Sequence, residues 1–262
     1  MSALATHWHS AWQSLSGNAS TAHLPWLVLT MAVYLAAMAL YRRSGNHPLL
    51  IPVFTAVVVI VGVLLATGTS YASYRSGVSL LGLLIGPATV ALAIPLYAQR
   101  ERIRALWLPI SVALAVGCVV ALLSALLIGW SLGATVQTLV ALAPKSATIP
   151  IALPMAERFG GPASLAAVAV AITGIAGTMM APLLIRLVRS DDPAVQGFAL
   201  GLTAHAIGTA RALQVNPTMG AFSALAMGLN GVATAVVMPL CLAVLRSEEH
   251  TSESSHSDRS RM

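Results

Sequence analysis

Charge is scarce in this sequence. Only 8% of its 262 residues are charged, whereas 57% are apolar, and a soluble domain carries roughly 25% charged residues. A soluble fold of this size needs a charged surface to stay dispersed in water. The contradiction disappears if lipid covers most of the surface, so we expect a polytopic integral membrane protein.

Acidic residues are the scarcest charged type. Before residue 247 there are twelve Lys or Arg but only four acids, namely Glu101, Glu157, Asp191 and Asp192. In a soluble protein this excess would suggest a nucleic-acid partner. Here the basic residues flank apolar runs, where they control topology, so we expect no nucleic-acid partner.

The sequence also lacks the common motifs of motors and enzymes. It contains no GK[ST] phosphate-binding loop, no G-x-S-x-G and no HExxH, so we expect neither an ATP-driven motor nor an enzyme, and no cofactor. Cys118 and Cys241 lie inside apolar runs and have no zinc-ligand spacing. Buried thiols are therefore expected, and no metal site.

Apolar runs make up most of the chain and predict an all-α fold. At roughly 20 residues per crossing, the length allows about seven or eight membrane segments. The runs are 23–41, 48–66, 80–97, 107–129, 131–143, 163–187, 193–213 and 217–245, with a polar loop at 67–79. We predict a membrane domain over 23–246, after a short extension over 1–22 that lacks the basic region of a signal peptide.

One segment is expected to be re-entrant. Residues 131–143 are too short to cross alone, and Pro144 and Pro150 follow them. If 131–157 enters and leaves the membrane on one side, the basic clusters at 42–43, 100–104 and 186–189 all lie on the inside.

Residues 247–262 change character abruptly. They are polar and Ser-rich, with mixed charge and no apolar face. This composition predicts a disordered tail and leaves open a non-native origin, so the tail carries no functional inference.

A short internal echo suggests a duplicated, broken membrane segment. Residues 88–95 read ATVALAIP, and residues 147–154 read ATIPIALP. Gly86, Pro87 and Pro95 are expected to break the first copy, as Pro144 and Pro150 break the second. Paired interrupted segments point to a transporter's binding site and a possible inverted repeat; a chance match in so apolar a chain is the alternative.

Lys145 is the only lysine of the chain. An ammonium group at membrane depth needs a partner or a water-filled cavity. Ser146 and Thr148 supply hydroxyls beside it, and a half-helix amino terminus would add positive dipole, so the place suits an anion. The alternative is a loop lysine that snorkels to water.

A second polar group lies in LTAHAIGTARAL, residues 202–213. His205 and Thr209 share a helical face at spacing four, while Arg211 would point about 120° from His205 on an unbroken helix. A break at Gly208 would let the three converge. With Lys145 they would form a cationic pocket, in which Arg grips a carboxylate through two parallel bonds. The alternatives are a packing histidine and an interfacial arginine.

Two small-residue pairs predict close helix packing. They are Gly82-x-x-x-Gly86 and Gly197-x-x-x-Gly201, and such pairs let helix backbones approach each other.

Several strings together closely resemble the LrgB family. They are HPLLI at 47–51, LIGPATVALAIP at 84–95, LAPKSATIPIAL at 142–153, ITGIAGTMMAPLL at 172–184 and ALGLTAHAIGTARAL at 199–213. They occur in the family's order over roughly 45–246, whereas the run 23–41 matches only loosely. The Lys-Ser string at 145–146 and the His-x-Ile-Gly-Thr-Ala-Arg string at 205–211 are the specific ones.

The resemblance implies a bacterial inner-membrane protein with many crossings, often called antiholin-like or a murein hydrolase export regulator. It also implies a small holin-like partner of the LrgA type and the passage of small monocarboxylates such as pyruvate, glycolate or glycerate. We therefore expect a monocarboxylate transporter that works by alternating access, driven by the substrate gradient or by a proton, with a homo-oligomer as an open possibility. The alternative is a regulator of murein hydrolase export and lysis.

Overall fold

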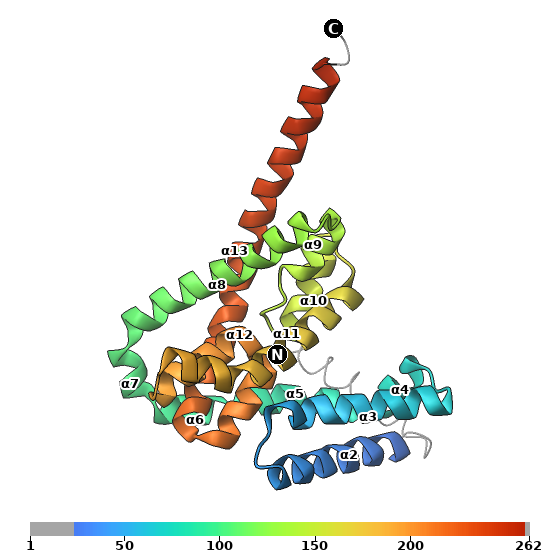
Figure 1. Ribbon diagram of the computed structural model, residues 1–262, viewed down its shortest axis with the longest axis vertical. Coiled ribbons are helices and arrows are strands. Elements are labelled where there is room, and N and C mark those ends of the chain that lie inside the picture. The colour runs from blue at the N-terminus through green and yellow to red at the C-terminus, as the bar shows by residue number, and fades with distance from the viewer. Residues whose placement is uncertain (1–23, 260–262) are drawn as a thin grey trace, which may run out of the picture. The chain divides into compact units, whose positions relative to one another are not determined.

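The computed structural model describes residues 24–259, with their side chains as far as residue 242, and every regular element in that range is helical (Figure 1). The extension over 1–22 lies outside the described residues. The elements are α2 (Leu24–Arg43), η1 (Pro48–Leu50), α3 (Pro52–Thr67), α4 (Tyr71–Gly77), α5 (Ser79–Ala91), α6 (Ala93–Ala98), α7 (Arg100–Ala105), α8 (Trp107–Ser131), α9 (Val136–Leu142), α10 (Ile149–Arg158), α11 (Ala163–Val188), α12 (Pro193–Val215) and α13 (Pro217–Arg259).

The helices confirm a polytopic membrane protein. Five stretches are long and apolar enough to cross a bilayer: Leu24–Arg43, Ser79–Ala98, Trp107–Ser131, Ala163–Val188 and Pro217–Leu242. Helix α3 is shorter but apolar. The expected number of seven or eight membrane segments stays a prediction. Many large apolar side chains are exposed along these helices, as lipid contact requires.

The chain divides into two compact units, the first ending at Ala93 and the second beginning at Ile94. In the first unit α2 packs against α3 and α4. The rings of Trp26 and Tyr74 meet edge to face at 5.9 Å, and the Thr30 hydroxyl lies 3.0 Å from the Tyr74 hydroxyl. The segment predicted to be a loop, 67–79, contains helix α4. The Ser70 hydroxyl caps this helix by accepting a hydrogen bond from the Ser73 amide.

In the second unit α13 is the central helix. One apolar cluster joins α13 to α8 and α9 through residues that include Leu122, Val140 and Met238. Another joins it to α8 and α12 through Ile110, Phe198 and Phe222. These clusters hold α12 against α13 and place both within the core of the unit.

Glycines bring α12 and α13 into backbone contact. A Cβ at Gly197 would collide with the Met219 carbonyl, and one at Gly201 with the Ser223 carbonyl. The predicted packing role of this glycine pair is therefore confirmed. A Cβ at Gly82 or Gly86 meets no atom of the first unit, as described, within 4 Å, so that pair makes no close packing there.

Helices α9 and α10 form a hairpin in which the residues just after α10 lie against α9. The turn over 143–148 joins them, and a Cβ at Gly161, just beyond α10, would lie 2.9 Å from the Ala141 amide nitrogen and 3.2 Å from the Gln137 carbonyl. Ala141 and Ala156 also share one apolar cluster with α11. A hairpin that closes in this way is the geometry of the predicted re-entrant segment.

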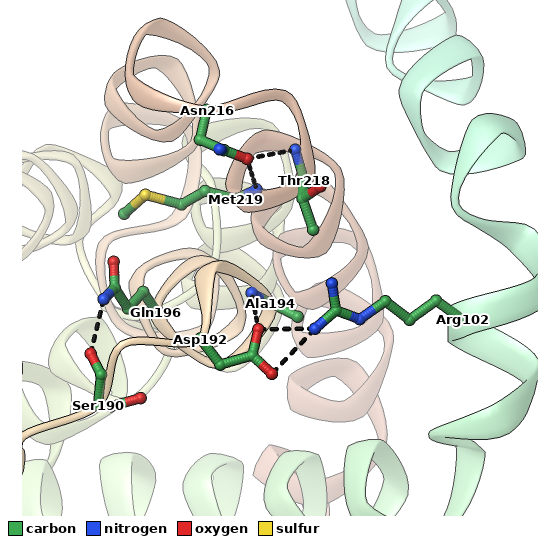
Figure 2. A network of polar contacts seen from close by, with 8 residues as sticks. All are labelled: Arg102, Ser190, Asp192, Ala194, Gln196, Asn216, Thr218 and Met219. Carbon is green, nitrogen blue, oxygen red and sulfur yellow. Dashed lines mark hydrogen bonds and ion pairs between the residues drawn. The ribbon is translucent and has the colours of Figure 1, made fainter.

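The ends of α7 and α12 are tied by charge. Arg102 donates to both carboxylate oxygens of Asp192 at 2.7 and 2.9 Å, while Asp192 also accepts from the Ala194 amide at the start of α12 (Figure 2). Asp192, the partner of Arg102, lies three residues after Arg189 in the sequence. This contact supports the predicted placement of the clusters at 100–104 and 186–189 on one face.

The helix breaks differ in position from those predicted from Gly and Pro. Helix α5 runs through Gly86 and Pro87 and ends at Ala91, because Pro95 has no N–H to donate to the Ala91 carbonyl. Pro95 itself lies in α6, and Pro150 occupies the first turn of α10, where proline is tolerated. The crossing of the two echo segments stays a prediction.

The region after residue 246 also differs from the expectation. Helix α13 continues to Arg259 through most of the segment that was predicted to be a disordered tail. No Gly or Pro occurs between residues 240 and 262, so the local sequence contains no strong helix breaker.

Replacing Asp192 by Ala tests the tie between α7 and α12. The variant loses an N-cap, worth about 1 kcal/mol, and an exposed ion pair, worth about 0.2–1 kcal/mol. We expect the free energy of unfolding in mixed micelles to fall by about 1–2 kcal/mol. Asp191→Ala is the matched control, since Asp191 is exposed. Equal stability of the two variants would show that the tie is unimportant.

Replacing Gly201 by Ala tests the α12–α13 contact. The new methyl group meets a backbone carbonyl, which cannot move aside as a flexible side chain would, so a loss of about 1–3 kcal/mol is expected. Gly228→Ala, on the same helix pair, meets nothing within 4 Å and should stabilise α13 by up to about 1 kcal/mol. The same sign of change in both variants contradicts this packing.

Candidate functional site

Lys145 lies in the turn that joins the two arms of the hairpin. Helix α9 ends at Leu142, and the Lys145 amide donates to the Leu142 carbonyl at 3.1 Å. Pro144 and Ser146 on either side are buried, while Lys145 is half-buried. Pro144 thus lies at an interruption, as predicted, and the turn presents a single cation between two helix ends.

The amino terminus of α10 points its positive end at this turn. Thr148 is the N-cap residue, with extended backbone (φ −75°, ψ 152°), and its side chain makes no capping hydrogen bond. The helix dipole adds partial positive charge there. The α10 terminus begins three residues after Lys145, and each of the two positive charges favours an anion as its ligand.

Helix α12 is broken at His205 and not at Gly208. His205 has φ 40° and ψ −129°, which are non-helical, whereas the helix resumes after it. Such a conformation costs a residue with a side chain on the order of 1–3 kcal/mol, so surrounding contacts must hold it. Gly208 serves packing instead: a Cβ there would lie 2.7 Å from the Leu200 carbonyl oxygen.

The ring of His205 is enclosed by α11. Its Nε2 lies 3.0 Å from the Val170 carbonyl oxygen, and a Cβ at Gly174 would lie 2.5 Å from its Cε1. Because a carbonyl only accepts, Nε2 carries the hydrogen. Nδ1 is buried and, within the described part of the chain, has no hydrogen-bond partner.

Thr209 forms a hydrogen bond with the backbone at the break. Its hydroxyl donates to the His205 carbonyl at 2.9 Å and lies 3.0 Å from the Ser223 hydroxyl on α13. This bond joins Thr209 to the backbone of His205, whereas the predicted shared helical face of the two side chains stays a prediction. Thr209 and Ser223 are both buried, so this polar link is inside the helix pair.

Asn230 connects the Lys145 turn to the α12 break. Its Nδ2 donates to the Ser146 carbonyl at 3.0 Å and to the Leu202 carbonyl, in the last turn before the break, at 3.3 Å. Asn230 is only 1% exposed, and its Oδ1 has no partner among the described residues. One amide side chain thus holds together the two segments that the sequence analysis singled out.

Arg211 follows the break, in the second half of α12, and is half-buried. Its approach to Lys145 in one cavity stays a prediction. From the sequence, no role was assigned to Asn230, Ser223 or Gly174. A buried amide in an apolar run was the one signal that pointed to Asn230, since burial of an amide demands partners.

Asn230→Leu is the test of this connection. The variant keeps the branched shape but replaces the amide with two larger methyl groups and removes the Asn230 donor from two buried carbonyls, at a cost of about 1–3 kcal/mol for each one left unsatisfied. We expect the free energy of unfolding in mixed micelles to fall accordingly. Thr203→Val is the control, because Thr203 is exposed and bonds only to its own helix; a loss no larger than that of the control would refute the connection.

The sequence is similar to those of several known proteins. The chain is 36% identical to the uncharacterized protein YxaC of Bacillus subtilis, over 82% of this chain and 93% of that protein. It is 35% identical to the uncharacterized protein YwbG of the same organism, over 84% and 97%. It is 28% identical to the antiholin-like protein LrgB of Bacillus subtilis, over 82% and 93%. No solved structure matches the chain.

The family match covers most of the membrane domain. It extends over residues 30–244, and thus begins earlier than the sequence strings suggested. It includes the Lys145 turn, the break in α12 and Asn230. The chain therefore belongs to the LrgB-like family.

Proposed function

We propose that this protein transports small monocarboxylates of the pyruvate, glycolate or glycerate class across a bacterial inner membrane by alternating access. The observation that carries the proposal is the Asn230 bridge between the Lys145 turn and the α12 break. Interrupted helices whose ends meet inside a membrane protein are the usual sites for small ions and substrates.

The charges suit such an anion. Lys145 and the α10 amino terminus contribute positive charge in or next to the turn that Asn230 bonds to, and Arg211 follows the α12 break in the sequence. The chain has no acid between Arg158 and Asp191 or between Asp192 and Glu248, so α11 and α12 bring no carboxylate to compete for these cations. A carboxylate of two or three carbons fits the recognition chemistry of an arginine fork and an ammonium.

A second candidate function is regulation of murein hydrolase export and lysis, together with a small holin-like partner of the LrgA type. Relatives that bear the name antiholin-like protein LrgB favour it. The two functions are compatible, since altered metabolite flux can change lysis.

Reconstitution separates the two. Purified protein in liposomes, with and without an LrgA-type partner, should take up radiolabelled pyruvate, glycolate or glycerate if it is a transporter. In cells, a Lys145→Met variant at matched abundance should lose both transport and any effect on lysis. Persistence of the lysis effect without transport would favour the regulator.

Arg211→Lys tests how the substrate is held. The variant keeps the charge but loses the planar fork, and loss of one charge-assisted hydrogen bond is worth about 1.5–3 kcal/mol. We expect apparent affinity to weaken about ten- to hundred-fold if binding limits transport. Arg104→Lys, at an exposed position, is the control. Unchanged affinity and rate for every substrate in the Arg211 variant would leave Arg211 an interfacial anchor.

A further inference from the structure

The backbone of His205 has an unfavourable conformation that contacts with neighbouring residues must hold in place. The backbone at φ 40° and ψ −129° is one that favours glycine, yet the residue is a histidine and is 3% exposed. Glycine at position 205 would relieve the backbone, so packing alone does not explain the side chain. The imidazole ring therefore requires a reason of its own.

The hydrogen bonds define which ring nitrogen is available. Val170 accepts from Nε2, at 3.0 Å, which fixes the neutral tautomer with a lone pair on Nδ1. That lone pair is buried and unpartnered in the described part of the chain. A buried acceptor without a donor is costly, and the smallest group that satisfies a lone pair is a proton.

The charged groups around the ring are few. Helix α11, which packs on the ring, carries no titratable side chain before Arg186, and α13 carries none before Cys241. Helix α12 itself contributes Arg211, and Lys145 lies in the turn that Asn230 ties to Leu202, three residues before His205. No carboxylate lies within α11, within α12 or among the described side chains of α13.

We propose that His205 is the proton-binding site that couples proton movement to anion transport, which rests on the proposed function. A proton adds to the Nδ1 lone pair, an N–H bond forms, and the neutral ring becomes an imidazolium with one positive charge. A monocarboxylate with one negative charge offsets it, so the loaded site gains no net charge. On the other side of the membrane the anion leaves and the same N–H bond releases its proton.

The coupling follows from electrostatics. A buried imidazolium without a carboxylate partner in an apolar interior is strongly disfavoured, so protonation requires the negative charge of the anion. Linkage is reciprocal, so the proton in turn strengthens anion binding. When one proton is bound with each anion, the apparent affinity rises about tenfold for each unit by which the pH falls.

The test is uptake of radiolabelled pyruvate and glycolate by liposomes containing the full chain, with a pH-sensitive dye inside and empty liposomes as background. In the wild type, the apparent affinity for the external anion should rise about tenfold for each unit by which the external pH falls. One proton should enter with each anion. In His205→Gln and His205→Asn, residual uptake should be slower and independent of pH. His205→Asn is included because Asn tolerates positive φ. His47→Gln, at an exposed histidine, should behave as the wild type.

A complementary chain keeps His205 as its only histidine, with the other six replaced by Gln: His7, His9, His23, His47, His250 and His256. Retained proton entry in this chain excludes the other six histidines as the proton carrier, which His205 requires, and this chain can be tested even if the His205 variants do not fold or do not transport. Wild-type uptake without proton entry, pH-dependent uptake by the His205 variants, or loss of proton entry in the single-histidine chain overturns the inference. Absence of any monocarboxylate transport by the wild type overturns the proposed function instead.

Discussion

The arrangement of the second unit depends on one buried amide. Asn230 donates both of its N–H groups to backbone carbonyls, one in the Lys145 turn and one before the α12 break. Neither carbonyl belongs to α13, so the amide joins three elements that apolar packing alone would leave free to slide. Buried hydrogen bonds of this kind specify one register because any other leaves polar groups unpaired. The candidate site exists where that register is fixed.

Close helix packing makes this bond possible. Gly197 and Gly201 let the α12 backbone touch α13, and Gly231, next to Asn230, has the Ile151 side chain of α10 against it. In a membrane protein the hydrophobic effect does not drive helices together within lipid, so small residues and interhelical hydrogen bonds carry more of the task. The close contacts at the glycines and the hydrogen bonds of Asn230 thus stabilise the same group of helices.

The break at His205 shows how the same packing holds a strained backbone within the candidate site. The ring bonds to Val170, Gly174 leaves space for it, and Thr209 bonds its carbonyl. These contacts hold an unfavourable backbone conformation, which natural proteins retain mainly where it serves a role. A transporter that alternates between two faces needs such a point, because a broken helix moves as two segments.

By itself, the sequence determined the membrane class, the approximate spans of the long apolar helices and the identity of the polar segments at 144–148 and 205–211, because lipid imposes length and apolar composition on each span. It misplaced the break at Gly208, since Gly and Pro mark only where a break is cheap. The contacts that hold His205 come from α11, 31 to 35 positions earlier in the chain. Asn230 likewise reaches 84 positions back to Ser146. Only tertiary structure decided these features, because a polar group in an apolar run shows that it needs a partner but not which partner it has.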